Sequence, residues 1–263
     1  MSAFRDGLFN GKSVFVAGGT SGINLGIAQR FAALGAKVGV IGRDPDRAAR
    51  AAASIGEGAL GLSADVRDYA ATRAAMEQVA AAHGAFDVVV SGAAGNFLAP
   101  ALNMSANAFK TVVDIDLNGT FNVFRGAHDL LNKPGASLIA ITAGQAINAS
   151  PLQAHACAAK AGINQLVRVL AMEWGPDVRV NGISPGPIEN TEGMARLAPD
   201  AASRAAYYER IPMRRWGEID EIAEAAVFLS SPSAGFITGT ILDCDGGSQL
   251  GDASRQSLER GMG

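Results

Sequence analysis

Cysteine is scarce in this sequence. Only Cys157 and Cys244 occur among its 263 residues, and they lie far apart in the chain. A small disulfide-stabilised protein needs several cysteines, and a zinc site needs ligands at close, regular spacing. Because neither pattern is present, we expect two free thiols in a reducing compartment and no metal site.

Charge of one sign gathers nowhere in the chain either. Lys and Arg number 22 against 25 Asp and Glu, giving a formal net charge of -3 without any block of like charge. A nucleic-acid surface is basic, so no nucleic-acid partner is expected. Residues 1–12 carry charges where a signal peptide has an apolar run, 260–263 are not a peroxisomal address, and no apolar run suits a membrane span. These absences predict a cytoplasmic protein without a membrane partner.

The chain does contain a regular alternation of short apolar strands and longer helical segments. Its composition, 48% hydrophobic and 18% charged, suits a sizeable core, which we expect to form one domain over residues 1–263. The alternation predicts an α/β fold, a doubly wound parallel sheet of Rossmann type with about seven strands and helices on both faces. Residues 192–214 are expected to form a lid over the ligand crevice, and 251–263 a loose tail. Strands are expected at 13–18, 37–42, 59–62, 87–91, 137–142, 178–183 and 240–242, and the main helices at 25–34, 69–83, 107–131, 153–173 and 220–229.

The first strand leads directly into a glycine-rich turn and then a helix. Residues 17–23 read Ala-Gly-Gly-Thr-Ser-Gly-Ile. Glycines at such a turn let the backbone approach a pyrophosphate, and the following helix offers unpaired N–H groups and a positive dipole end. The pattern predicts a dinucleotide site, with a Gly-rich turn in an unrelated α/β protein as the alternative. The residues expected to form it are Gly18, Thr20, Ser21, Gly22 and Ile23.

Arg43 follows the second strand, where an NAD site carries an acidic residue. An arginine there pairs with a 2′-phosphate, so the sequence favours NADP(H), with Ser21 or Thr20 assisting. In the alternative, Arg43 is a solvated loop residue and Asp44 caps the helix that begins after it.

Lys160 lies early in the helix predicted over 153–173, where apolar residues recur at three- and four-residue spacing. A lysine in such a place is more often a solvated surface residue than a catalytic one. Its role therefore depends on the rest of the chain.

Taken together, these stretches resemble the short-chain dehydrogenase/reductase family over nearly the whole chain. The resemblance implies a nicotinamide dinucleotide and, usually, a homotetramer. It also implies that Asp65 approaches the adenine, that Ile188 meets the carboxamide and that Lys160 holds the nicotinamide ribose, with Val66, Ala93, Pro185 and Gly186 completing the cofactor site. The motifs that carry the resemblance are 17–23, 64–66, 87–95, 159–160, 179–181, 184–188, 215–217 and 245–247.

Several positions depart from the family pattern. Members that reduce ketones carry a tyrosine four residues before the lysine, a serine upstream of it and an asparagine on the preceding long helix. Here Ala156, Ala143 and Asp116 occupy those places, and Asn24 replaces a glycine of the nucleotide loop. An alanine cannot donate a proton, so the family's usual proton transfer is not expected.

The altered set resembles one branch of the family, the 2,4-dienoyl-CoA reductases, especially the peroxisomal type, from about residue 86 to 199. This resemblance implies NADPH-dependent reduction of a conjugated enoyl thioester, with an acyl-CoA as the substrate. Lys160 and Asp116 would then be the catalytic pair, the lysine stabilising an oxyanion and the aspartate holding a proton-donating water.

Further residues are candidates by position. His155 is either a second proton source or the partner of a backbone carbonyl. Asn96, Phe97, Asn118 and Gln145 are expected at the substrate. Two other functions stay open: a non-catalytic NADP-binding protein, which the missing tyrosine favours, and a carbonyl reductase that uses His155 as its acid.

Overall fold

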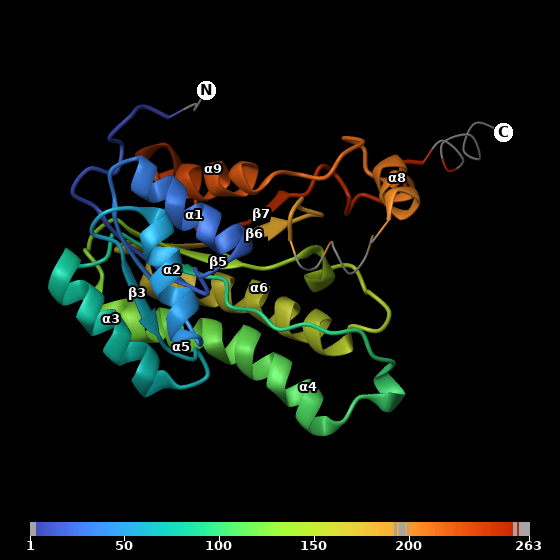
Figure 1. Cartoon of the computed structure of the whole chain (residues 1–263), viewed down its shortest axis with the longest axis horizontal. Coiled ribbons are helices and arrows are strands. Elements are labelled where there is room, and N and C mark those ends of the chain that lie inside the picture. Colours follow the sequence, from blue (N-terminus) through green and yellow to red (C-terminus); the bar gives the residue numbers. More distant parts are fainter. Residues whose placement is uncertain (1–3, 192–193, 195–197, 199, 255–256, 258–263) are drawn as a thin grey trace.

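The structure is a computed structural model that describes residues 4–191, 194, 198, 200–254 and 257. Within these residues, seven strands form one parallel sheet in the order β3-β2-β1-β4-β5-β6-β7 (Figure 1). The chain leaves β1 in one direction toward β2 and returns to its other side at β4, and a parallel sheet binds ligands at the carboxyl ends of its strands at such a point. The predicted doubly wound α/β sheet is confirmed.

The central strands are continuous apolar runs because both of their faces are covered by helices. Every residue of β1, β4 and β5 is buried. The strand bounds are β1 (Ser13–Ala17), β2 (Lys37–Gly42), β3 (Leu60–Ser63), β4 (Val88–Ser91), β5 (Ala136–Ile141), β6 (Val178–Pro185) and β7 (Ile241–Cys244).

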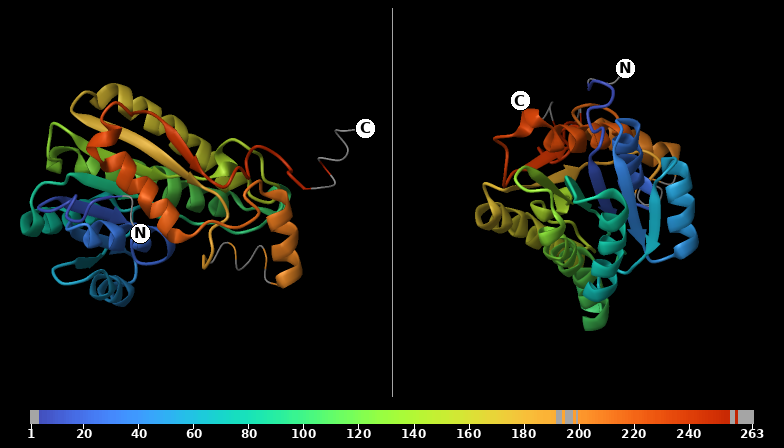
Figure 2. Two further views of the ribbon diagram at one scale, coloured as in Figure 1. Left: turned by 90° about the horizontal axis from the view of Figure 1, so that it is seen from above. Right: turned by 90° about the vertical axis from the view of Figure 1, so that its left-hand side faces the viewer.

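The helices divide between the two faces of the sheet (Figures 1 and 2). Residues of α1, α2 and α9 share one buried cluster with the sheet, and residues of α3, α5 and α6 share another. The helix bounds are α1 (Gly22–Ala33), α2 (Pro45–Ile55), α3 (Tyr69–His83), α4 (Ala106–Val113), α5 (Gly119–Ala127), α6 (Ala154–Trp174), α8 (Ala201–Arg210) and α9 (Ile219–Ser230).

The helix predicted over 107–131 is not uniform. After α4, residues Asp114–Asn118 form a π-helical turn, η2, before α5 continues the rod. A π-turn adds a residue to one turn of the helix, and such insertions are frequent at functional sites. Here the turn carries Asp116 on its buried side.

The amino edge of the sheet is fastened by one carboxylate. Asp87, just before β4, accepts hydrogen bonds from the backbone N–H of Ser13 (2.9 Å), the Nζ of Lys12 (3.0 Å) and the Nδ2 of Asn132 (2.8 Å). It thereby joins the start of β1, the start of β4 and the loop before β5.

Helix α8 lies at one end of the molecule, beyond the carboxyl ends of the strands (Figure 2). Its Tyr208 ring packs at 5.5 Å from the buried Trp216, and the Tyr208 hydroxyl donates to Glu189 Oε1 at 2.7 Å. Part of the predicted lid, 192–193, 195–197 and 199, lies outside the described residues, as does most of the predicted tail, 255–256 and 258–263.

None of the helices in the described part of the chain is both long and apolar enough to cross a bilayer.

Candidate active site

A cavity of about 1110 Å³ opens along the carboxyl ends of the strands, from β3 to β6. It runs past the glycine-rich turn after β1, the loop after β4 and the amino-terminal part of α6. Most of the residues predicted from the sequence to bind cofactor or substrate line this one cavity.

The glycine-rich turn forms an anion site at one wall. Gly18 needs its glycine, because a Cβ there would lie 2.7 Å from the Ala93 nitrogen, and its φ is +76°. Ser21 precedes α1 without capping it, and no acidic residue stands in the first turn. The first N–H groups of α1 are therefore left for a ligand, and a Cβ on Gly22 would meet nothing within 4 Å. These residues fit the pyrophosphate of a dinucleotide, and Thr20 and Ile23 line the same wall.

The far end of the cavity is bordered by arginine. Arg43 and Arg47 both line it, whereas the Asp44 carboxylate accepts hydrogen bonds from the N–H groups of Asp46 and Arg47 and caps α2. The predicted adenine residues Asp65 and Val66 lie beside them. Arg47 was not predicted; the available signal was its place in the first turn of the helix that begins just after Arg43.

Asp65 is itself part of an ion pair. The Arg67 guanidinium donates to both of its carboxylate oxygens, at 2.6 Å for the shortest contact. These bonds to Arg67, partly opposed by burial, hold the pKa of Asp65 below its ordinary value. The carboxylate is thus charged and oriented at neutral pH.

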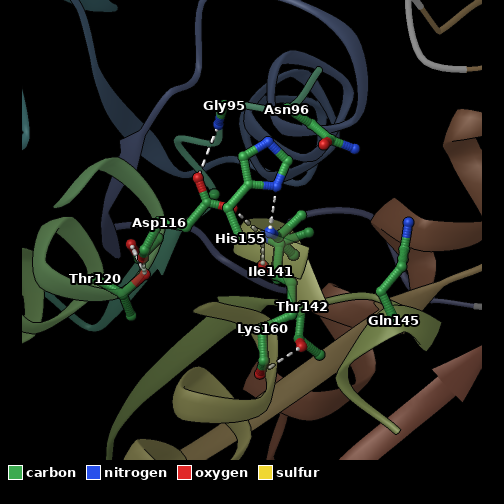
Figure 3. Close-up of polar contacts among 12 residues, drawn as sticks. Gly95, Asn96, Asp116, Thr120, Ile141, Thr142, Gln145, His155 and Lys160 are labelled. Atoms are coloured by element: carbon green, nitrogen blue, oxygen red, sulfur yellow. Dashed lines mark hydrogen bonds and ion pairs between the residues drawn. The ribbon is translucent and has the colours of Figure 1, made fainter. Parts of the chain in front are cut away.

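Lys160 and Asp116 meet near the middle of the cavity wall (Figure 3). The Lys160 Nζ lies 3.2 Å from Asp116 Oδ2 and donates to the carbonyl of Ile141 at 3.1 Å. Asp116 Oδ1 accepts the N–H of Gly95 at 2.8 Å, which fixes the loop after β4 to the same carboxylate. The side chains are only 10% and 1% exposed. Two buried charges of this kind are tolerable because each offsets the desolvation of the other.

Small side chains border the ion pair. Ala143 and Ala156 line the cavity next to Lys160, and the Thr142 hydroxyl points elsewhere, donating to Asn164 Oδ1 at 2.7 Å. The predicted cofactor residues Ala93, Pro185 and Gly186 complete this region of the wall.

His155 is fully buried and lies outside the cavity lining. Its Nδ1 accepts the N–H of Ala156 at 2.7 Å, so the predicted bond to a backbone carbonyl is not found. The ring packs edge-on against Phe97 at 4.3 Å, and Phe97 also lies outside the lining. Neither side chain is placed to touch a substrate in this cavity.

Two further predicted residues are not brought to the cavity. Asn118 is exposed and donates to Asp114 Oδ1 at 2.9 Å. It follows Asp116 by two positions in the π-turn η2, and whereas Asp116 is buried, Asn118 is exposed. Ile188 is buried and borders a separate cavity of about 510 Å³. Neither residue lines the main cavity, and their assigned roles stay predictions.

Besides Arg47, two residues were not assigned to the site from the sequence: Asn24, noted there only as a replaced loop glycine, and Gln153. Asn24 donates from Nδ2 to the carbonyl of Gly92 at 2.8 Å and fills the space in which a Gly92 side chain would stand. Gln153 is buried, and its Oε1 accepts from Asn96 Nδ2 at 2.6 Å and from Gln145 Nε2 at 3.4 Å. Asn96 and Gln145 line the cavity.

Comparison with known proteins agrees with this arrangement. Residues 17–249 match the family model described as enoyl-(acyl carrier protein) reductase. The chain is 42% identical to the peroxisomal 2,4-dienoyl-CoA reductase [(3E)-enoyl-CoA-producing] of Rattus norvegicus, over 94% of this chain and 87% of that protein. It is 40% identical to the corresponding Saccharomyces cerevisiae protein, over 93% and 86%. A short chain dehydrogenase from Bacillus anthracis matches in structure with a TM-score of 0.82 at 34% identity, over 91% of this chain and 97% of that one.

Proposed function

The chain belongs to the short-chain dehydrogenase/reductase family, and we propose that it is an NADPH-dependent reductase of 2,4-dienoyl thioesters, with an acyl-CoA as substrate. The named activity of relatives about 40% identical over almost the whole chain supports the reaction type. The cavity supports it independently, through the residues that the chemistry requires.

The observation that carries the proposal is the buried Lys160–Asp116 pair in a site without a hydroxyl acid. Ala156 and Ala143 line the cavity, and by the sequence resemblance they take the places where ketone-reducing members of the family carry tyrosine and serine. Reduction of a ketone needs a proton donor at the alkoxide oxygen, and a methyl group cannot supply one. Reduction of a conjugated thioester needs only a stabilised oxyanion and a proton delivered to carbon, so it suits this site better.

The choice of NADPH rests on the arginine-bordered end of the cavity. Arg43 and Arg47 supply two cations where a 2′-phosphate would lie, and Asp44, which also lines this end of the cavity, is engaged as the N-cap of α2. Held along this cavity, NADPH would supply the hydride, which a conjugated thioester would accept at C5. Ser21 and Thr20 lie at the same wall and can add hydrogen bonds to phosphate.

Lys160 then acts on the charge that develops at the thioester oxygen. Its position is fixed by Asp116 and Ile141, which leaves its remaining N–H for the cavity. A positive charge held beforehand in a site of low polarity stabilises an oxyanion more strongly than water does. Lys160 therefore contributes mainly in the transition state.

Asp116 has two roles in the proposal. It holds Lys160 and the Gly95 loop in place, and each of its oxygens keeps a lone pair that can accept from a water. A water held there can deliver a proton to the dienolate carbon. Protonation at C2 gives a 3-enoyl product, in agreement with the named product of the relatives, whereas protonation at C4 gives a 2-enoyl product.

Other parts of the proposal concern the protein as a whole. We place it in the cytoplasm as a homotetramer, and we assign 192–214 as the lid over the thioester. Both described cysteines are free, which is compatible with a reducing compartment.

The two alternatives receive less support from the cavity. A carbonyl reductase using His155 would need that ring at the substrate, but it is buried behind the wall. A non-catalytic NADP-binding protein has no need for an ion pair buried beside the nicotinamide end.

A substrate panel tests the proposal. NADPH absorbance is followed with a 2,4-dienoyl-CoA of several chain lengths, with a 3-ketoacyl-CoA and without substrate. We expect oxidation with the dienoyl-CoA alone. Turnover of the 3-ketoacyl-CoA alone would assign a carbonyl reductase, and no turnover with any substrate would assign a non-catalytic protein.

A further inference from the structure

Three side-chain amides, those of Asn96, Gln145 and Gln153, meet at the substrate end of the cavity. The Gln153 side chain is buried and does not itself line the cavity. Gln153 Oε1 accepts from Asn96 Nδ2 and Gln145 Nε2, the two amides that line the cavity. We propose that Gln153 is a positioning residue, which aims the Asn96 and Gln145 amides at the thioester oxygen so that they form a two-donor oxyanion site. This inference rests on the proposed reduction of a conjugated thioester.

The position of Gln153 in the chain is unusual for its residue type. It is the N-cap of α6, where Ser, Thr, Asp or Asn normally accepts an N–H of the first turn, and it makes no such bond. The neighbouring His155 ring accepts the N–H of Ala156 instead. Because the His155 imidazole accepts one N–H of the first helical turn, the side-chain oxygen of Gln153 is not needed there. It can accept hydrogen bonds from the amides that line the cavity instead.

The backbone just before Gln153 is also held in a costly conformation. Leu152 has a φ of +67°, in the left-handed region that a bulky residue rarely adopts. Its carbonyl accepts the N–H of Ala99, which ties this turn to the loop carrying Asn96. Local strain of this kind persists where the surrounding structure imposes it, often at functional sites.

Hydrogen-bond counting shows what this arrangement leaves for a ligand. One amide oxygen has two lone pairs, and Gln153 Oε1 gives one to Asn96 and one to Gln145. Each donor nitrogen carries two hydrogens, so one N–H of Asn96 and one of Gln145 remain. Since the nitrogens are held by an oxygen, the two amides are also fixed against flipping. The longer contact, from Gln145, can shorten when a substrate fills the cavity.

The two N–H groups that remain, one on Asn96 and one on Gln145, suit a thioester oxygen that gains negative charge. Asn96 and Gln145 come from different segments of the chain, both donate to Gln153 Oε1, and both line the same cavity as Lys160. Ala143 and Ala156 leave the space between them and Lys160 open to a thioester. In a dienolate the charge resides largely on oxygen, and two neutral N–H donors together with a nearby cation match it without needing to lose a proton.

A spectroscopic experiment measures this donation without turnover. A 2,4-dienoyl-CoA is added to the enzyme holding NADP⁺, which cannot give a hydride, and the near-ultraviolet band of the conjugated thioester is recorded. Donors at the carbonyl oxygen polarise the chromophore, so we expect a red shift on binding to the unmodified protein. Gln153→Leu and Gln145→Leu should each remove most of the shift.

The same variants are then assayed with NADPH. Removing one oxyanion donor lowers kcat on the order of 100-fold in enzymes studied for this effect, so we expect about that loss for Gln145→Leu and about 10-fold for Gln153→Leu. NADPH affinity should change by less than about two-fold, because no amide of this cluster lies at the phosphate wall. Gln165→Leu is the matched control: it alters an exposed glutamine on the same helix and should leave shift and kcat unchanged.

The outcomes separate this inference from the proposed function. If the unmodified protein turns over dienoyl-CoA but Gln153→Leu and Gln145→Leu keep both the shift and kcat at the level of Gln165→Leu, the oxyanion site is wrong and the reductase assignment stands. If the unmodified protein neither shifts the band nor oxidises NADPH, both fail. Gln145 lies in the short 3-10 turn Gly144–Ala146 and is only half-buried, so its variant decides the question even if Gln153→Leu does not fold.

Discussion

At the scale of single residues, Lys160 and Asp116 depend on each other. Each is nearly fully buried, and the carboxylate also holds the N–H of Gly95. Removing one charge therefore has two effects, the loss of the function of that residue and the exposure of its partner to an apolar environment without compensation.

Substitution of the pair should show this coupling. Lys160→Ala should lower kcat about 100-fold or more, because the lysine stabilises charge that appears in the transition state. Asp116→Asn should impair protonation while leaving NADPH affinity nearly unchanged. The double variant should be little slower than the poorer single variant, and it should melt above Lys160→Ala because it leaves no unpaired buried charge. Single-turnover kinetics and thermal unfolding measure the two effects, and turnover within a few-fold of normal in both single variants would refute the mechanism.

Arg43 governs a second residue-scale prediction, the choice of cofactor. Arg43→Asp should weaken NADPH binding by about 1–3 kcal/mol, the range for a charge-assisted contact, and NADH binding much less. Titration by NAD(P)H fluorescence gives both affinities. Arg50→Asp, on the exposed side of α2, has the same charge change and serves as the control. Equal losses for the two cofactors would remove Arg43 from the 2′-phosphate site.

Residue types that act through local patterns were predictable, and those that act through tertiary contacts were not. The turn glycines, Arg43 and Lys160 were predictable because each lies directly after a predicted strand or near the start of a predicted helix. Gln153 was not, because its importance arises from Asn96 and Gln145, which reach it from other loops. Asn118 was assigned to the substrate because a side-chain amide suits the chemistry. Its position in the helical turn leaves this side chain exposed.

At the scale of elements, α6 and α9 were predicted to within one residue because their apolar periodicity is unbroken. The π-turn η2 was not predicted. Its residues, Asp114–Asn118, are compatible with an ordinary α-helix, and the extra residue in the turn is recognisable only through backbone hydrogen bonds.

The start of α9 provides a pH prediction. Glu221 accepts from both terminal nitrogens of Arg215 and from the N–H of Glu218, and the bonds to Arg215 foremost lower its pKa from 4.5 to about 2. Because the folded pKa lies below the unfolded one, this stabilisation is complete above about pH 4.5 and is lost as the pH falls toward about 2. The pair is partly exposed, so the effect is modest.

Thermal unfolding of Glu221→Gln between pH 2 and 6 checks this. The melting temperature of the unmodified protein should exceed that of the variant at pH 6 and converge with it toward pH 2. Glu57→Gln, at an exposed turn, is a control that should follow the unmodified protein. A gap that stays constant with pH would show that the Glu221 carboxylate is not the titrating group.

At the scale of the whole molecule, the last strand leaves an unpaired edge and an apolar surface. β7 ends the sheet in the described residues, and just before it Phe236 is fully exposed, while Met172 on α6 is 85% exposed. Exposed edges and apolar patches are normally covered in a stable protein.

We therefore predict a symmetric homo-oligomer that buries the segment 236–242. Light scattering at micromolar concentration should give a multiple of the 26.9 kDa chain mass. Phe236→Glu should reduce that mass, whereas Leu102→Glu, a substitution at an equally exposed apolar residue distant in the chain, should leave it unchanged. A monomeric mass for the unmodified protein would contradict the prediction.

The position of the Asp87 carboxylate suggests that thermal stability and catalysis depend on different parts of the sheet. The carboxylate fastens β1, β4 and the loop before β5 at the amino edge, a full strand length away from the cavity at the carboxyl edge. We therefore expect substitutions at the amino-terminal margin to change thermal stability and substitutions at the cavity margin to change the chemistry. We expect Asp87→Asn to shorten the lifetime of the folded protein at elevated temperature and to leave the turnover rate of each folded molecule unchanged. Natural variation at this margin can therefore adapt the protein to a warmer or colder habitat without altering its product.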